Sequence, residues 1–393
     1  MASRYNGHHS ISELHLVLLP TILLMCSPAL PAAISFSCDF PAVFNFGDSN
    51  SDTGGLSSAF GPAPPPNGET FFGRPSGRYS DGRLIIDFIA ESLGLPYLSA
   101  YLNSIGTNFS HGANFATAGS TIRRQNTTLF QGGYSPFSLD VQTWQFTQFK
   151  SRSQFFFSQG GVFRDLLPSE ELFSKALYTF DIGQNDLTAG YRVGLTTDEV
   201  KEAIPDILNQ FTVAIKAIYW QGGRYFWIHN TGPFGCLPYI LDNLALRAPE
   251  VDRAGCGSPF NGVAQLFNSL LKETVLQLRK ELPLASFTYV DVYSNKYRLI
   301  SHAREYGFEH PLVACCGHGG VYNYNKNFGC GSKTKVNGTE IVIGSCREPL
   351  KRVNWDGVHY TEAANKWIFD QISEGNFSDP PLPLRMACSK EAP

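Results

Sequence analysis

Three residue types that together support nucleophilic catalysis lie near the two ends of this chain. Ser49 stands in a glycine-rich string directly after the apolar run at 42–46, a pattern that predicts a strand ending in a tight turn. Asp356 precedes His359 by three residues, so its carboxylate could orient the imidazole if the segment turned as a helix begins. A serine hydroxyl is a weak nucleophile and needs a base and an oxyanion site, so the pattern predicts a serine, acid and base brought together by folding.

The elements expected to position these residues alternate between short strands and longer helices. Strands are expected at 42–46, 176–180, 225–229 and 287–292, and helices at 83–93, 200–218 and 263–278. This alternation is typical of a parallel sheet covered by helices on both faces. Ligands bind at the carboxyl ends of such strands, so the strings after Phe46 and Phe180 are expected to meet at one edge.

Local signals refine two of these segments. Thr196 and Glu199 form a capping-box pattern before the helix at 200–218, and Pro205 inside that helix predicts a bend. The stretch at 315–346 is rich in Gly, Asn, Tyr and Cys without a sustained period. We therefore expect a loop region held by disulfides there.

Size and charge limit the class of protein. The chain has 393 residues and a formal net charge of −3, with lysine and arginine scattered singly. A domain with long loops can reach this length, so we expect one domain rather than two. Lysine and arginine are not clustered into a basic stripe that could bind phosphates, and nucleic acid is therefore not an expected partner.

The first 33 residues have the layout of a cleaved secretory signal. Arg4 precedes an apolar stretch at 16–24 and a run of small residues at 27–33. A membrane anchor is the alternative, but Pro20 and Pro28 interrupt the stretch, which is shorter than the roughly 20 apolar residues that a span requires. We expect residues 34–393 to form the mature protein, without a transmembrane segment.

Cysteines and glycosylation signals agree with secretion. Removal of the signal would take Cys26 and leave an even number of cysteines: Cys38, Cys236, Cys256, Cys315, Cys316, Cys330, Cys346 and Cys388. These predict a disulfide framework with roughly 100 possible pairings, whereas zinc is disfavoured because no Cys-x-x-Cys pair occurs. Sequons occur at Asn108, Asn126, Asn337 and Asn376.

Four sequence blocks carry a family resemblance. They are Phe-Gly-Asp-Ser-Asn-Ser-Asp-Thr-Gly-Gly at 46–55, Gly-Ala-Asn-Phe-Ala-Thr-Ala-Gly-Ser at 112–120, Gly-Gln-Asn-Asp at 183–186 and Asp-Gly-Val-His at 356–359. In this order they resemble the plant GDSL esterase/lipase family of the SGNH hydrolases. The similarity extends over roughly 38–375 and includes Asn-Thr-Gly-Pro at 230–233. Within the family, the chain resembles the branch that holds early-nodulin-like proteins and the latex esterase allergen. No Gly-x-Ser-x-Gly string of the α/β-hydrolase elbow occurs.

The resemblance implies a fold and a set of roles. The fold would be α/β: a three-layer α/β/α sandwich with a central parallel sheet, flavodoxin-like, in one domain. Ser49 would be the nucleophile, His359 its general base and Asp356 the group that orients His359. The oxyanion would be held by the backbone N–H groups of Ser49 and Gly119 and the amide of Asn185. Glycine permits close approach and a neutral amide is not titrated, so both residue types suit that role.

These roles imply a secreted serine esterase that acts through an acyl-enzyme, without a metal or organic cofactor. The expected substrate is a small-molecule or glycan ester with a short acyl group such as acetyl, and a lipid ester is the alternative. The protein is expected to be an extracellular monomer of the cell wall or apoplast. A fucosidase-like glycosidase is one alternative, which would need two carboxylates from Asp48, Asp52, Asp186 and Asp356. A non-catalytic defence or binding protein is another.

Several polar residues near the motifs are given structural roles. Asp48 is expected to fix its turn through local N–H groups, with Asp52 acting likewise or lying at the surface, and Asp186 acting likewise beside Asn185. No partner can be named for His229, His302 or His318, and the phenylalanines are assigned to the core.

Overall fold

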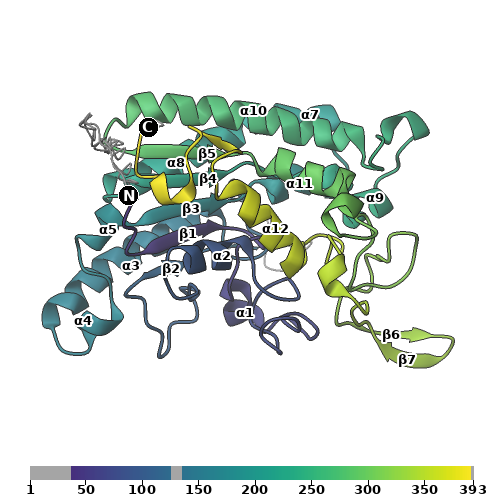
Figure 1. The fold of residues 1–393 in the computed structure, drawn as a ribbon, viewed down its shortest axis with the longest axis horizontal. Helices are drawn as coiled ribbons and strands as arrows, with labels where there is room; N and C mark the ends of the chain where they lie inside the picture. Colours follow the sequence, from purple (N-terminus) through teal and green to yellow (C-terminus); the bar gives the residue numbers. More distant parts are fainter. Residues whose placement is uncertain (1–36, 125–134, 391–393) are drawn as a thin grey trace, which may run out of the picture. The chain divides into compact units, whose positions relative to one another are not determined.

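A computed structural model describes residues 37–124 and 135–390 (Figure 1), so the expected signal at 1–33 and the sequon at Asn126 lie outside the described residues. The central sheet has the strand order β2-β1-β3-β4-β5-β8. Its strands are β1 Val43–Gly47, β2 Gly112–Asn114, β3 Leu177–Asp181, β4 Tyr225–His229, β5 Ser286–Val290 and β8 Ser378–Asp379. All neighbours pair in parallel except β8, a two-residue edge strand antiparallel to β5.

Helices cover both faces of this sheet. One layer consists of α3 Leu139–Gln159, α8 Ile204–Trp220 and α10 Ser258–Glu281; the other consists of α2 Ile85–Ser92, α11 Val292–Ser301 and α12 Glu362–Ile372. Shorter helices are α1 Gly55–Phe60, α4 Phe163–Leu166, α5 Leu172–Lys175, α6 Gln184–Arg192, α7 Thr197–Glu202 and α9 Pro238–Asn243. In Figure 1, α12 crosses in front of the sheet and α10 runs along the top. The expected three-layer α/β/α class is confirmed.

The sheet separates two hydrophobic cores because alternate side chains of each strand point to opposite faces. Toward α3, α8 and α10, neighbouring strands place Phe46, Phe180, Phe226 and Phe287 in a row of stacked rings, with centroid separations of 5.0, 6.3 and 4.7 Å. The opposite face carries Val43, Leu177, Trp227 and Val290, which pack under α2, α11 and α12. These phenylalanines belong to the core, as expected.

Most expected elements occur within a few residues of their predicted limits, with two differences. The helix expected at 200–218 is divided at Ala203 into α7 and α8, because Pro205 lacks an N–H group and fits only the first turn of the second helix. The capping box of Thr196 and Glu199 begins α7 as predicted. The last expected strand stops at Val290, because the Asp291 side chain accepts the N–H of Ser294 and begins α11.

Four disulfides tie the loops to this frame: Cys38–Cys388, Cys236–Cys256, Cys315–Cys346 and Cys316–Cys330. Two of them hold the loop at 315–346, as the composition predicts, and this loop also contains the hairpin β6 Lys333–Val336 and β7 Thr339–Val342. Asn337 and Gly338 form the hairpin turn with φ of 50° and 82°. The sequon asparagines Asn108, Asn337 and Asn376 are exposed.

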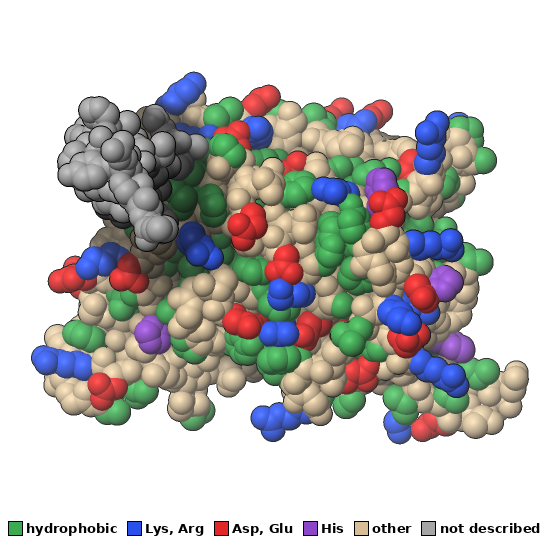
Figure 2. Space-filling model, in the orientation of Figure 1, with side chains coloured by type: hydrophobic (Ala, Val, Ile, Leu, Met, Phe, Trp, Pro, Cys, Tyr) green, Lys and Arg blue, Asp and Glu red, His purple; other side chains and the backbone are tan. Residues whose placement is uncertain are grey.

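The visible surface carries no dominant charge. Figure 2 shows basic and acidic side chains interspersed over the face viewed, in keeping with the small net charge. Within residues 37–124 and 135–390, no helix is both long and apolar enough to cross a bilayer.

Candidate functional site

A pocket of about 260 Å³ lies where β1 and β3 end. Its lining includes Ser49, Gly119, Asn185 and His359, which come from four separate segments of the chain. The remaining wall is formed by Leu56, Tyr79, Ala118, Gln184, Thr188, Arg192, Tyr239, Tyr324 and Val358. The expectation that the strings after Phe46 and Phe180 meet at one edge is confirmed, because β1 and β3 pair in register from Val43 with Leu177 to Gly47 with Asp181.

Ser49 stands in a tight turn just after β1. The Asp48 carboxylate fixes this turn by accepting the backbone N–H of Asn50 at 2.9 Å and its side-chain amide at 3.0 Å. Ser49 is only 7% exposed and lines the pocket. Among the described residues, no acceptor takes the backbone N–H of Ser49 or of Gly119. Both N–H groups are therefore open to an acceptor from outside these residues.

Buried amides hold the end of β1 in place. The Gln142 side chain of α3 accepts the N–H of Gly47 at 3.0 Å and donates to the Gly47 carbonyl at 2.8 Å, so it occupies both backbone groups before the turn. Asn114 donates to the Ser51 carbonyl at 2.6 Å on the other side of the turn. Sequence reasoning missed α3 and Gln142, because the helix mixes polar and aromatic residues without a clear apolar stripe.

Asp52 links the turn of Ser49 to the loop of Gly119. It is fully buried and accepts N–H groups from Gly54 at 2.7 Å and Leu56 at 3.1 Å, and from Ala118 in the loop of Gly119 at 2.7 Å. The expected local hydrogen bonds are present, whereas the alternative of a surface position is wrong. One carboxylate thus sets the distance between two of the loops that line the pocket.

Gly119 and Asn185 line the wall beside Ser49. Gly119 has a φ of 81°, a left-handed conformation that glycine adopts without strain. The Asn185 amide donates to the Ser120 carbonyl at 2.9 Å and makes a longer contact of 3.3 Å with Asp48. The neighbouring Asp186 accepts the N–H groups of Ile122 and Arg123 at 2.8 and 2.9 Å. Its role is structural, as expected, but these partners belong to a loop distant in sequence and are not local.

His359, which lines the pocket, and Asp356 form a close pair. The imidazole Nδ1 lies 2.6 Å from Asp356 Oδ2, while the other carboxylate oxygen accepts the N–H groups of Val358 and His359. The segment is a turn, and α12 begins only at Glu362. Burial alone would lower the pKa of His359, but the charge and hydrogen bond of Asp356 outweigh it and raise that pKa above 6.5.

The second ring nitrogen of His359, a residue that lines the pocket, has no partner among the described residues. Nε2 is buried and has no hydrogen bond to any described residue, so none joins it to Ser49 in this structure. Bonds of this kind are often long in unliganded sites and tighten when substrate binds. Nδ1 is held by Asp356, so Nε2 is the ring nitrogen that remains open to another partner.

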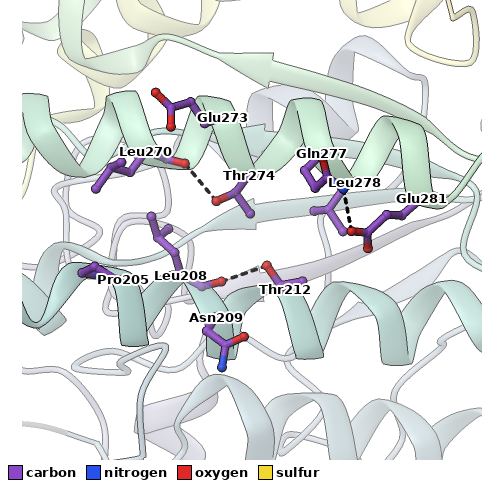
Figure 3. Close-up of a pocket in the computed structure, with 10 residues that line it drawn as sticks. All are labelled: Pro205, Leu208, Asn209, Thr212, Leu270, Glu273, Thr274, Gln277, Leu278 and Glu281. Atoms are coloured by element: carbon purple, nitrogen blue, oxygen red, sulfur yellow. Dashed lines mark hydrogen bonds between the residues drawn. The ribbon is translucent and has the colours of Figure 1, made fainter.

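The acids that a glycosidase would need are directed elsewhere. Neither Asp48, Asp52, Asp186 nor Asp356 lines the pocket, and no other acidic residue of the described chain does so. A larger hollow of about 360 Å³ between α8 and α10 has Glu273 and Glu281 in its lining (Figure 3). Its hydroxyls are bonded to their own helices, Thr212 to the Leu208 carbonyl and Thr274 to that of Leu270, and no histidine lines it.

The parallel sheet, with Ser49 and His359 in one pocket at the ends of β1 and β3 and Asp356 beside the imidazole, defines the class of α/β protein. The family of GDSL-like lipases and acylhydrolases matches residues 43–372. The chain belongs to this family. The resemblance noted in the four sequence blocks is thereby confirmed.

Plant relatives match nearly the whole chain. "GDSL esterase/lipase ACHE" of Zea mays is 64% identical over 89% of this chain and 89% of its own, and "Esterase" of Hevea brasiliensis is 60% identical over 93% of each. "Alpha-L-fucosidase 3" of Arabidopsis thaliana is 61% identical over 94% of this chain and 97% of its own. With esterase relatives at these identities, the chain is a carboxylic ester hydrolase.

Proposed function

We propose that the protein is a secreted serine esterase that cleaves short acyl groups through an acyl-enzyme on Ser49. The observation that carries this proposal is that Ser49, Gly119, Asn185 and His359, distant in sequence, line one pocket, with Asp356 2.6 Å behind the imidazole. In this proposal Ser49 is the nucleophile, His359 the general base and Asp356 the orienting group.

The proposed reaction has two stages. Ser49 Oγ attacks the ester carbonyl while His359 Nε2 takes its proton, and the N–H groups of Ser49 and Gly119 hold the oxyanion together with the Asn185 amide. His359 then protonates the leaving alcohol, and water activated by the same imidazole releases the acid. To donate to the oxyanion, the Asn185 amide gives up its long contact with Asp48 and turns that N–H to the oxyanion. Its bond to the Ser120 carbonyl keeps the amide in place.

The pocket favours a small acyl group on a polar alcohol. Its volume of about 260 Å³ lies below the usual range for drug-sized ligands. Tyr79, Tyr239 and Tyr324 together with Gln184 and Arg192 give the wall polar and aromatic groups of the kind that contact sugars. We therefore propose an acetylated carbohydrate or glycoside as the substrate class. The four disulfides support export to an oxidising, extracellular compartment such as the cell wall.

Activity is expected to rise with pH between about 6.5 and 8. The base must be neutral, and the pKa of His359 is raised above 6.5 by Asp356, so the neutral fraction still increases in that range. kcat/KM for p-nitrophenyl acetate from pH 5 to 9 tests this, and a flat profile contradicts His359 as the base.

Acyl length separates the candidate functions. We expect kcat/KM to fall at least about tenfold from p-nitrophenyl acetate to the octanoate, because a small pocket excludes the longer chain. Faster cleavage of the octanoate would favour a lipid ester. The name of the Arabidopsis relative makes p-nitrophenyl α-L-fucoside the matched glycoside test. The pocket lacks a lining carboxylate, so we expect no fucoside hydrolysis, whereas turnover that survives Ser49→Ala would support the glycosidase.

A further inference from the structure

The segment at 77–83 contributes one residue to the pocket wall and is bonded to the structure on either side of that residue. The Arg78 guanidinium donates to both carboxylate oxygens of Asp87 in α2, at 2.6 and 2.8 Å. The Ser80 hydroxyl, which is fully buried, donates to the Tyr360 carbonyl at 3.0 Å. Such bonds hold a backbone segment firmly, because breaking one leaves a buried polar group without a partner. The residue between Arg78 and Ser80 is therefore held in one place.

The same segment holds the start of α12. Asp81, also fully buried, accepts the backbone N–H of Glu362 at 2.7 Å. Arg83 donates to the Glu362 carboxylate at 2.8 Å, and this carboxylate leaves no space for a Cβ at Gly82. Because α12 begins at Glu362, three residues after His359, these contacts fix the segment and the imidazole relative to each other.

Tyr79 is the residue that this segment presents to the pocket. Its ring lies beside the imidazole of His359, with the two ring centroids 5.6 Å apart and the planes tilted by 38°. Both side chains line the pocket. A substrate atom that reaches the imidazole from this pocket therefore comes close to the Tyr79 side chain.

The hydroxyl of Tyr79 is open to a ligand. Tyr79 is half-buried, yet within residues 37–124 and 135–390 its hydroxyl has no hydrogen-bond partner and is not enclosed. Burial, and then the charges of Asp52 and Asp356, raise the pKa of Tyr79 to about 12, so the hydroxyl stays protonated at neutral pH. It can both donate and accept a hydrogen bond. The pocket thus offers a substrate one polar group that the protein leaves unused.

The proposed reaction decides which part of an ester lies beside Tyr79. The carbonyl oxygen is held by the N–H groups of Ser49 and Gly119 and by the amide of Asn185, whereas His359 protonates the leaving alcohol. The alcohol oxygen must therefore lie at the imidazole, and the ring beside the imidazole borders the alcohol. A hydroxyl group next to the ester on that alcohol is the substrate group within reach of the phenol.

We propose that Tyr79 is a specificity-determining residue: its hydroxyl binds the hydroxyl group adjacent to the ester on the leaving alcohol. The preferred substrates are then monoesters of vicinal diols, as in a partly acetylated sugar, rather than esters of simple alcohols. Because the segment at 77–83 already holds the tyrosine in place, little ordering is needed when the substrate binds. The inference rests on the proposed function, since it requires the alcohol to leave from the side of His359.

Tyr79→Phe tests the proposal, because it keeps the ring and removes only the hydroxyl. The substrates are the monoacetate of vicinal cyclohexanediol and cyclohexyl acetate, whose alcohols differ by one hydroxyl group. We expect the ratio of kcat/KM for the diol ester to kcat/KM for cyclohexyl acetate to fall at least about fivefold in Tyr79→Phe. Tyr97→Phe is the matched control and should keep the wild-type ratio, because the Tyr97 hydroxyl contacts Glu91 at 3.3 Å outside the pocket.

A ratio that is the same in Tyr79→Phe and in the wild type would overturn the proposal. Thermal unfolding gives a second check, since a melting temperature lowered by more than about 3 °C would assign the hydroxyl a partner within the protein and would also contradict it. Ser49→Ala is measured in parallel. If it retains hydrolysis, the proposed function fails, whereas an inactive Ser49→Ala with an unchanged ratio in Tyr79→Phe removes only the role of Tyr79.

Discussion

Replacing Ser49 with alanine is expected to lower kcat for p-nitrophenyl acetate by about 10⁴-fold or more, with the fold retained. The hydroxyl oxygen of Ser49 forms the ester bond of the acyl-enzyme in the proposed reaction. No second hydroxyl group of the described residues directly after β1 lines the pocket to replace it. The turn itself depends on Asp48, Asp52 and Gln142, which bind backbone groups and do not use the Ser49 side chain. Stability should therefore change little, and thermal unfolding of both proteins checks this.

Ser51→Ala is the matched control in the same turn. Ser51 is 3% exposed, does not line the pocket, and its Oγ has no hydrogen-bond partner among the described residues. Its loss should leave kcat within about threefold. An organophosphate that modifies nucleophilic serines should add its mass to the wild type and to Ser51→Ala but not to Ser49→Ala. Hydrolysis by Ser49→Ala near the wild-type rate would refute the acyl-enzyme.

Replacing His359 with alanine is expected to cost a similar factor, about 10⁴-fold or more in kcat, because the serine loses its base and the leaving group its acid. Asp356 would keep its bonds to the N–H groups of residues 358 and 359, so the turn before α12 should persist. The residual rate should also lose the dependence on pH between 6.5 and 8 that neutral imidazole gives. Initial rates at several pH values measure both effects.

His302→Ala is the comparison for that variant. His302 is exposed at the end of α11 and contacts the hydroxyl of Ser301, outside the pocket. We expect wild-type kcat and an unchanged pH profile from it. If His359→Ala retained the rising limb, another group would have to be the base, and the pairing of His359 with Asp356 would then be structural only.

Local sequence was sufficient wherever a few neighbouring residues decide the structure. The strand before Ser49, the strand at 225–229 and the capping box of α7 follow from residue types within one turn or one strand. The spacing of Asp356 and His359 is also local, since a three-residue turn brings carboxylate and ring together. The even number of cysteines predicted disulfides for the same reason: the count needs no fold, although the pairing does.

Other features escaped prediction because their cause lies far away in the chain. β2 is only three residues long, and it is a strand because β1 offers it a pairing partner. α3 is a helix whose polar and aromatic surface packs against the sheet and the neighbouring helices. Gln142 gives no sign in the sequence that it would hold the backbone of Gly47 across the domain. The hydrogen-bond partners of His229 likewise depend on the fold: they are Trp227 on its own strand and Asp181 on the next one.

The amino-acid sequence by itself determined the chemical types available and the local turns that present them: a serine after a strand, an aspartate three residues before a histidine, and glycines where left-handed backbone is required. Tertiary structure alone decided that these turns share one pocket, which cysteines pair, and that the buried carboxylate of Asp52 joins the turn of Ser49 to the loop of Gly119. Hydrogen bonding and steric preference act over a few residues, so they can be read along the chain. Burial and electrostatic balance depend on every segment that packs around a group, and only the folded chain brings those segments together.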